Sequence, residues 1–284
     1  MADISTELAA IESANFGEEL RTPVGSALGK INQEISAHTD LINNDIFHRC
    51  YYRGASLGSG ATFEQASTPE QRTAIQNGSF SDMFIGDYWT IDSKIFRIAD
   101  FNYWKYIGDT SFTQNHLVIV PDEIMGSGKM NSTNITTGAY VGSEMNTDEN
   151  STLNTARATI ASLFGSYLGT HKSYLANTVT DGAESAGAFV ESSVDLMSEI
   201  MVYGCNIRKK TISNTYLATS DKTQLALFRL NPSLIQHKRQ YWWLRDVVSG
   251  TSFAVVHYRG NASDGGASYS AGVRPAFPLV VPSE

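Results

Sequence analysis

Near the end of the chain, two blocks rich in aromatic and apolar residues enclose a segment of small polar residues. The first block is residues 241–246 (YWWLRD) and the second is residues 272–277 (GVRPAF), and each carries one arginine. The segment between them is rich in Gly, Ser, Ala and Asn, which offer too little apolar surface to form a core. This layout predicts a rigid frame that displays a binding surface, and it fits a catalytic pocket less well.

Six residues of the enclosed segment have side chains suited to recognition: His257, Tyr258, Arg259, Asn261, Asp264 and Tyr269. Tyrosine combined with Ser, Gly and Asn is typical of adaptable binding loops, because the rings give rigid contact area and the small residues give flexible hydrogen bonding. We therefore predict that Tyr258, Arg259 and Tyr269 anchor a ligand, with Asn261 and Asp264 as polar partners. The alternative is a solvated loop without a ligand.

The composition favours a folded chain and argues against several classes of partner. Apolar residues make up 42% of the chain and charged residues 18%. Lys and Arg number 21 against 29 Asp and Glu, so the net charge is −8, and nucleic acid is not expected as a partner because phosphate binding needs a basic face. The N-terminus lacks a secretory signal pattern, and no run approaches the roughly 18 apolar residues of a membrane helix. We expect synthesis in a cytoplasm without membrane insertion.

Residues 1–45 differ from the rest and predict a helical segment. Val24, Leu28, Ile31, Ile35 and Ile42 follow a heptad spacing. Apolar residues at both seam positions, with isoleucine dominant, favour three strands over two. The sequence therefore predicts a trimerising coiled coil, and the alternative is a short amphipathic helix packed on its own domain.

Residues 46–284 predict one domain that mixes helices and strands, without a linker that would divide it. The expected strands are 84–91 and 94–98, joined as a hairpin by Asp92 and Ser93, and a buried strand over 117–120 that Pro121 ends. The expected helices are a short one at 68–76, one over 153–167 and one near 193–203. Residues 53–60 and 126–150 are expected to be loops, and the chain beyond 212 is expected to form short strands and loops.

No local motif predicts catalysis, a metal or a cofactor. Residues 54–58 (GASLG) match the pattern of a nucleophile elbow, but a loop rather than a helix is expected to follow. Residues 126–129 (GSGK) lack the glycine and the hydroxyl residue of a phosphate-binding loop. Cys50 and Cys205 have no metal-binding spacing, and two lone buried thiols are the favoured interpretation, although a disulfide stays open.

Several charged residues lie among aromatic ones, and their types predict a structural role. These are Asp82, Asp87, Asp100, Asp109, Arg97, Arg245 and Arg274. Because buried charges are normally paired, we expect charge-assisted hydrogen bonds that tie long loops to the frame. The alternative is a polar pocket.

Six short motifs, taken in order, resemble a family of bacteriophage virion proteins from phages and prophages of Gram-positive bacteria. They are residues 86–91 (GDYWTI), 120–122 (VPD), 140–145 (YVGSEM), 202–204 (VYG), 241–247 (YWWLRDV) and 272–277 (GVRPAF). The resemblance covers about residues 50–280. The C-terminal part is similar to the C-type-lectin-like domain of phage tropism determinants, including those varied by diversity-generating retroelements.

The resemblance implies an α+β fold, with a C-type-lectin-like domain over 46–284 preceded by the helical segment 1–45. It implies that the stretch between Arg245 and Gly272 contacts a receptor, within a variable display surface at about 240–278. Residues 15–21 (NFGEELR) are similar to the opening of phage tail and baseplate proteins, which implies attachment to the virion. No calcium-ligand triplet of the animal lectins is present.

The function implied is a tail or fibre-tip receptor-binding protein of the virion. It would be a homotrimer that binds a bacterial surface protein or glycan through 246–271 and phage structural proteins through its N-terminus. The alternative is a head fibre or capsid decoration protein with a structural or weakly adhesive role. An enzyme on the same fold is not expected, because Cys205 stands alone where the enzymatic branch of the fold has active-site cysteines.

Overall fold

The computed structural model describes residues 24–26, 28–33, 35, 48–106, 112–211, 221 and 223–282. The chain divides into two compact units, Met1–His48 and Arg49–Glu284. In the first unit, every described residue from 24 to 35 is helical, as the heptad spacing predicts.

The apolar seam of the first unit lies partly on the surface of the single chain. The side chains of Val24, Ile31 and Ile35 are 44%, 48% and 44% exposed, and Leu28 is half-buried. Ile42 lies outside the described residues. The coiled coil and its trimer therefore stay predictions.

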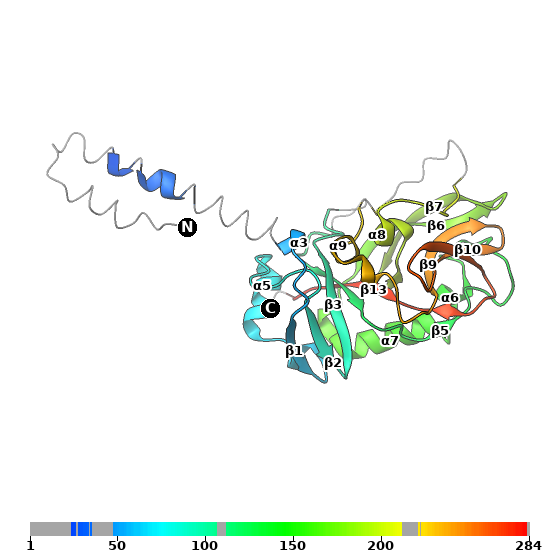
Figure 1. Cartoon of the computed structure of the whole chain (residues 1–284), viewed down its shortest axis with the longest axis horizontal. Coiled ribbons are helices and arrows are strands. Elements are labelled where there is room, and N and C mark those ends of the chain that lie inside the picture. Colours follow the sequence, from blue (N-terminus) through cyan, green and yellow to red (C-terminus); the bar gives the residue numbers. More distant parts are fainter. Residues whose placement is uncertain are drawn as a thin grey trace. The chain divides into compact units, whose positions relative to one another are not determined.

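The second unit is a mixed α+β structure with three sheets and several short helices, which agrees with the predicted class (Figure 1). Its helices are α4 (Phe63–Ala66), α5 (Pro69–Asn77), α6 (Glu144–Thr147), α7 (Thr152–Phe164), α8 (Glu199–Tyr203) and α9 (Ala226–Leu230), with 3-10 turns at Gly165–Tyr167 and Pro232–Leu234. The short helix α3 (His48–Cys50) lies at the division between the units.

A six-stranded sheet with the order β1-β2-β3-β4-β13-β8 forms one part of the second unit. Its strands are β1 (Ser56–Gly60), β2 (Tyr88–Ile91), β3 (Lys94–Phe101), β4 (Leu117–Pro121), β13 (Pro275–Leu279) and β8 (Asp195–Leu196). The predicted hairpin is confirmed: Asp92 and Ser93, with φ of 46° and 64°, join β2 to β3. The predicted buried strand is also confirmed, since every residue of β4 is buried.

A five-stranded sheet with the order β11-β10-β9-β12-β5 carries the C-terminal segment. Its strands are β5 (Ser127–Gly128), β9 (Trp242–Ser249), β10 (Ser252–Val256), β11 (Ala262–Gly266) and β12 (Ala271–Gly272). Gly272 pairs with Trp242 in a parallel bridge, and its amide nitrogen lies 2.8 Å from the carbonyl oxygen of Tyr241. The two aromatic blocks are therefore hydrogen-bonded neighbours.

The third sheet is a long hairpin that the sequence reasoning missed. It consists of β6 (His171–Thr180) and β7 (Ala183–Ser192). Asp181 and Gly182 form its turn with φ of 50° and 74°, and an Asp-Gly pair is one of the strongest hairpin signals. Both strands contain many small or half-exposed residues, which blurs the alternation on which strand prediction depends.

Residues 56–60 form the edge strand β1, so the prediction of a loop there was wrong. Two glycines allow the packing: a Cβ atom at Gly58 would lie 2.1 Å from the carbonyl oxygen of Ala66, and one at Gly60 would lie 2.7 Å from its amide nitrogen. Helix α4 can therefore lie directly on β1. The helix expected near 193–203 is shorter than predicted, because Asp195 and Leu196 pair with β13 before α8 begins.

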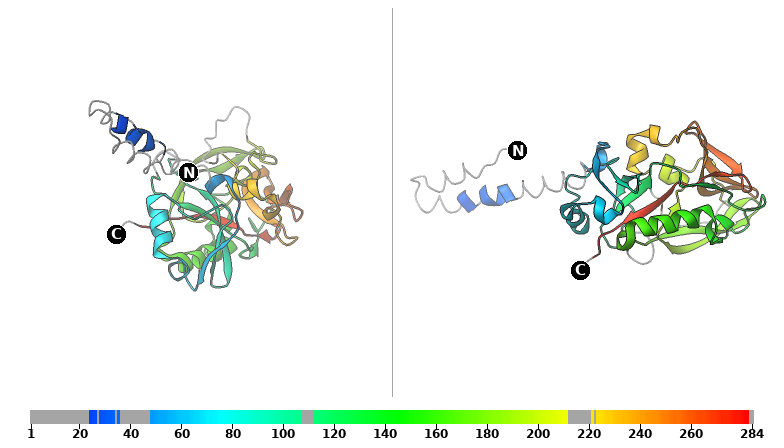
Figure 2. Two further views of the ribbon diagram at one scale, coloured as in Figure 1. Left: turned by 60° about the vertical axis from the view of Figure 1, so that its left-hand side comes forward. Right: turned by 90° about the horizontal axis from the view of Figure 1, so that it is seen from below.

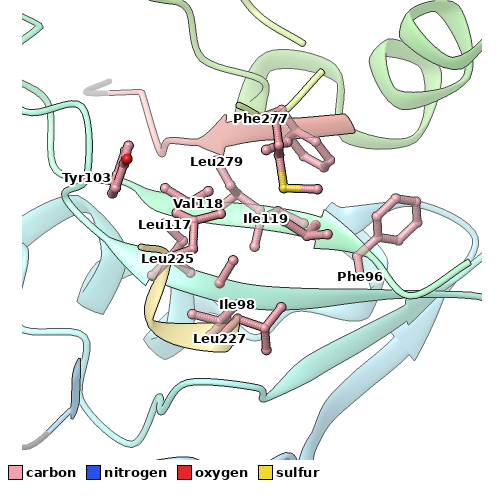
Figure 3. Packing of buried hydrophobic residues seen from close by; sticks show 14 of the residues in the cluster. Phe96, Ile98, Tyr103, Leu117, Val118, Ile119, Leu225, Leu227, Phe277 and Leu279 are labelled. Atoms are coloured by element: carbon pink, nitrogen blue, oxygen red, sulfur yellow. The ribbon is translucent and has the colours of Figure 1, made fainter. Parts of the chain in front are cut away.

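The main hydrophobic core lies around β3, β4 and β13 (Figure 3). The side chains that Figure 3 labels are Phe96, Ile98, Tyr103, Leu117, Val118, Ile119, Leu225, Leu227, Phe277 and Leu279. Helix α7 packs beside β13 (Figure 2), where Phe164 contacts Phe277 with ring centroids 4.8 Å apart and Phe96 at 5.1 Å. A second core cluster surrounds Trp243 on β9.

Ion pairs and hydrogen bonds tie the long loops to the sheets, as the charged residues predict. Asp87 is fully buried and accepts from Arg53 at 2.7 Å, while the same guanidinium pairs with Asp82. Arg97 pairs with Asp122 at 2.7 Å. Asp100 accepts from Arg49 and from the backbone amide of Ala226. Asp109 lies outside the described residues.

The two cysteines are free in the structure, and both are exposed. The expectation of buried thiols was therefore wrong. Cys50 ends the short helix α3, and Cys205 follows Gly204, which ends α8 with a φ of 84°. Both positions are element ends, where the chain reaches the surface.

Candidate functional site

The two tryptophans and the two arginines of the frame are buried, and each forms a hydrogen bond inside the unit. Trp242 and Trp243 are fully buried, and their indole nitrogens donate to the carbonyl oxygens of Ile235 at 3.1 Å and Gly128 at 2.8 Å. Arg245 is 6% exposed and forms an ion pair with Asp221. The frame role expected for the first block is confirmed for Trp242, Trp243 and Arg245.

Arg274 closes the other side of the frame from within the core. It is 1% exposed, and it donates to the carbonyl oxygens of Pro121 at 3.0 Å and Leu234 at 2.7 Å. Its guanidinium also lies 5.5 Å from the ring centroid of Trp242. Burial lowers the pKa of Arg274 to about 10, although Asp122 opposes this. The residue still carries its charge at neutral pH, and it acts as a structural clamp.

The predicted contact residues lie on and beside the hairpin formed by β10 and β11. The turn is closed by hydrogen bonds from the amide of His257 to the carbonyl of Asn261 at 2.9 Å and from the amide of Gly260 to the carbonyl of His257 at 2.7 Å. Gly260 has a φ of 88°, and its carbonyl accepts from the hydroxyl of Tyr203 at 3.2 Å. The turn is therefore held from both sides.

Four rings meet on one partly exposed surface, which we call the aromatic face: Tyr241, His257, Tyr258 and Tyr269. Tyr241 is the hub, with its ring centroid 4.8 Å from His257, 5.5 Å from Tyr258 and 6.1 Å from Tyr269. Tyr269 is 51% exposed, and the other three are half-buried. Such edge-to-face contacts hold the rings in fixed positions while part of each stays in solvent.

Sequence reasoning placed Tyr241 in the frame and missed it as a site residue. It directly precedes two buried tryptophans, so the run looks uniformly apolar. Only the rings that contact Tyr241 in the fold reveal its role. Tyr241 precedes the first residue of β9 and is half-buried, whereas the strand residues that follow it, Trp242 to Val248, are buried. The sequence did offer one signal. Among the three consecutive aromatic residues, Tyr241 carries a hydroxyl group, and a tyrosine can keep that group in solvent.

A shallow cleft of about 380 Å³ lies beside the aromatic face. Its lining comprises Tyr241, Val255, His257, Ser263, Asp264, Gly265, Gly266 and Tyr269. Gly265 lies against the frame, because a Cβ atom there would approach the Trp243 ring to 3.2 Å. Gly265 and Gly266 therefore form part of the cleft wall, and Gly265 packs against the buried ring of Trp243.

Charged groups border the cleft. Asp264 forms an ion pair with Arg208, a residue that sequence reasoning missed, and their side chains are 31% and 46% exposed. The guanidinium of Arg259 lies 5.3 Å from the ring centroid of Tyr258. Asn261 is exposed at the turn, where its side-chain amide donates to the carbonyl of Ala262 at 3.3 Å.

The structure thus brings four of the six predicted residues, His257, Tyr258, Asp264 and Tyr269, together around Tyr241 and the cleft. Arg259 and Asn261 lie in the adjoining turn, where Arg259 contacts Tyr258. Flat ring area beside paired charges can bind a ligand through stacking and hydrogen bonds. Within the ranges that the structure describes, no group of three or more His, Cys, Asp or Glu side chains is placed to hold a metal ion. No helix in those ranges has the length and apolar character needed to cross a membrane.

Residues 169–281 match a family described as a domain of unknown function (DUF6273). The match covers less than half of the chain, and it includes the β6–β7 hairpin, the frame and the aromatic face. No curated protein and no solved structure matches the chain.

Proposed function

We propose that this protein is a receptor-binding protein of a bacteriophage particle, and that the aromatic face contacts the surface of the host bacterium. The observation that carries the proposal is the cluster of four partly exposed rings beside two fully buried tryptophans. Rings already held in place lose little conformational freedom on binding, and aromatic and arginine residues dominate the energy of interfaces. The receptor is a bacterial surface protein or glycan.

The frame supports this function because it separates stability from recognition. Trp242, Trp243 and Arg274 make their contacts inside the unit, whereas the segment between the blocks contributes mainly small or half-exposed residues. Substitutions at the exposed positions therefore change the surface without opening the core. This is the property expected of a tropism determinant with a replaceable contact patch.

We further propose that Arg49–Glu284 is a C-type-lectin-like domain. The supporting features are the six motifs in their order and the mixed architecture, in which the last strand β13 lies inside the six-stranded sheet. The loop-rich sheet with β9, β10 and β11 carries the display segment. An experimental structure tests this proposal. The proposal would be contradicted if the core strands did not superpose on those of known C-type-lectin-like domains.

Residues 1–45 are proposed to attach the protein to the virion and to form its trimer. The exposed aliphatic side chains of Val24 and Ile31 in this helical segment support an apolar contact surface for other chains. Three weak sites on one assembly raise the overall affinity by roughly 10²–10⁴ over a single site. Sedimentation of the full chain at micromolar concentration is expected to give a trimer, and a monomer would contradict the proposed seam.

Binding of the labelled full chain to host cells tests the function. In the double variant Tyr258→Ala with Tyr269→Ala, we expect binding to fall by at least about thirty-fold, since an interface hot spot contributes about 2 kcal/mol or more. The matched control is Tyr106→Ala, which removes a tyrosine that is 69% exposed in the segment after β3. This control is expected to bind as the wild type does.

The outcomes separate the candidate functions. Unchanged cell binding in the double variant would refute the aromatic face as the contact surface. A large fall in its melting temperature would show that the two rings serve the core instead. Binding to purified capsids without binding to cells would favour a head fibre or decoration protein.

A further inference from the structure

Three charged side chains, those of Glu184, Lys209 and Asp246, form a triad that takes no part in the aromatic face. Asp246 ends the first aromatic block, but its carboxylate makes none of the frame contacts described above. Nζ of Lys209 lies 3.0 Å from Oδ1 of Asp246 and 2.8 Å from Oε2 of Glu184. The side chains of Glu184 and Asp246 are 2% and 3% exposed, and that of Lys209 is 21% exposed. Two buried carboxylates that share one partly exposed amine are costly as a purely structural device.

We propose that this triad is a site of self-modification, in which Lys209 and Asp246 join through an isopeptide bond with Glu184 as the proton carrier. The inference is independent of the proposed receptor-binding function. It rests on the contact between nucleophile and electrophile, on the second carboxylate at proton-transfer distance, and on the groups that hold all three in place.

The backbone holds the reacting groups in fixed positions. The carboxylate of Glu199 accepts from the amides of Ile207, Arg208 and Lys209 at 2.8–3.0 Å, which fixes the loop that carries the lysine. Asp246 belongs to β9, and Oε1 of Glu184 accepts from the amide of Val247 at 3.0 Å. Such positioning replaces a random encounter with a nearly unimolecular step.

The loop that carries Lys209 also joins two strands. The amide of Lys210 donates to the carbonyl of Val247 on β9 at 2.9 Å, and its carbonyl accepts from the amide of Glu184 on β7 at 2.9 Å. The lysine therefore enters between the two strands that carry its partners. A cavity of about 190 Å³, lined in part by the same three side chains, lies beside the triad.

The chemistry balances with the groups present. A proton passes from the Lys209 ammonium through Glu184 to the Asp246 carboxylate, which leaves a neutral amine beside a carboxylic acid. The Nζ lone pair then attacks Cγ of Asp246 and forms the N–C bond. The C–Oδ1 bond breaks, Glu184 delivers to Oδ1 the proton that it takes from nitrogen, and one water leaves. An ammonium and a carboxylate thus become an amide and water, without any redox step.

One backbone donor is placed to stabilise the intermediate. The amide of Glu199 donates to Oδ2 of Asp246 at 2.6 Å, which is the oxygen that gains negative charge when Cγ becomes tetrahedral. Burial raises the pKa of Glu184, which suits a group that must pick up and release a proton. Burial alone lowers the pKa of Lys209, but the two carboxylates raise it overall, so the reaction starts from the ion pair.

The mass of the denatured full chain tests the proposal. After the folded wild-type protein has been kept at neutral pH, we expect most chains to have lost the mass of one water molecule. Proteolysis followed by tandem mass spectrometry should place the link between Lys209 and Asp246. Chains with the full sequence mass, or with the loss located elsewhere, would overturn the proposal.

Three variants separate the chemistry from the fold. Lys209→Arg keeps a positive charge but removes the nucleophile, and it is expected to retain the full mass. Lys210→Arg is the matched control at the exposed neighbouring lysine, and it is expected to lose water as the wild type does. Glu184→Gln keeps the shape without the proton carrier, and cross-linking at the wild-type level in this variant would refute the role of Glu184. The wild-type mass decides the outcome even where a variant does not fold.

Discussion

His171 is a buried histidine whose surroundings predict sensitivity to acid. It is 1% exposed and stacks on Trp104 with ring centroids 4.0 Å apart. Neither ring nitrogen has a hydrogen-bond partner among the described residues. Burial lowers the pKa of His171 to about 4, although Asp195, whose Oδ2 lies 3.8 Å from Nε2, opposes the shift.

The sign of the effect follows from the two pKa values. In the unfolded chain a histidine has a pKa of about 6.5, so between that pH and about 4 the unfolded chain binds a proton that the folded chain does not. The contribution to stability is therefore complete above the unfolded pKa and is lost as the pH falls. From about pH 7 to about pH 5, His171 alone should lower the free energy of unfolding by roughly 2 kcal/mol.

Urea denaturation of the wild type and of His171→Gln, followed from about pH 7 to about pH 5, measures this effect. Near pH 5.5, the slope of unfolding free energy against pH should be smaller in the variant by roughly 1.2 kcal/mol per pH unit. Ile119→Val, at a fully buried position, is the control that lowers stability without removing a titrating group. Equal slopes in His171→Gln and the wild type would refute the reasoning.

Three further substitutions test the loop ties, a glycine position and a helix cap. Asp87→Ala removes a fully buried carboxylate that accepts hydrogen bonds from Arg53 and from two backbone amides. It should lower the free energy of unfolding by roughly 3 kcal/mol in urea titrations. A loss below about 1 kcal/mol would contradict the role of Asp87 in tying the loop to the sheet. Gly86→Ala, at a φ of 85° and with the new Cβ 2.1 Å from the Tyr52 ring, should cost about 2 kcal/mol or more by the same assay, and unchanged stability would show that the turn adapts freely. Ser151→Ala removes the hydroxyl that caps α7 at 3.1 Å and should lower the melting temperature in calorimetry by an amount equivalent to about 1 kcal/mol, whereas Thr155→Ala, one turn into the helix, should have a smaller effect.

Local sequence signals predicted the structure correctly where a residue type or a periodic pattern strongly favours one backbone conformation. The hairpin turn at Asp92 and Ser93, the stop at Pro121 and the apolar stripe of α7 each follow from backbone preference or from helical periodicity. The same reasoning failed for residues 56–60. Two glycines there indicate flexibility in isolation, but in the fold they admit α4 at backbone distance.

The candidate site was only partly accessible to sequence reasoning. Composition identified residues 257–266 as partly exposed, but it wrongly predicted that the enclosed segment forms no core. Strand β10 in the same segment is buried from Phe253 to Val256. Composition did not identify Tyr241 or Arg208, which approach the segment from outside it. Nor did it identify the Lys209 triad, whose members come from β7, a loop and β9.

By itself, the sequence determined the mixed α+β class and the buried frame with its two arginines. These follow from side-chain chemistry and spacing along the chain, which are local properties. The sequence did not determine which part of the segment between the two arginines is exposed, since β10 is buried except at Ser252. Tertiary structure alone decided that Gly272 pairs beside Trp242, that four rings share one face, and that a lysine meets two carboxylates. These contacts join residues that are far apart in the sequence, so they depend on which strands become neighbours. Strand pairing is set by the packing of the whole core rather than by any single segment.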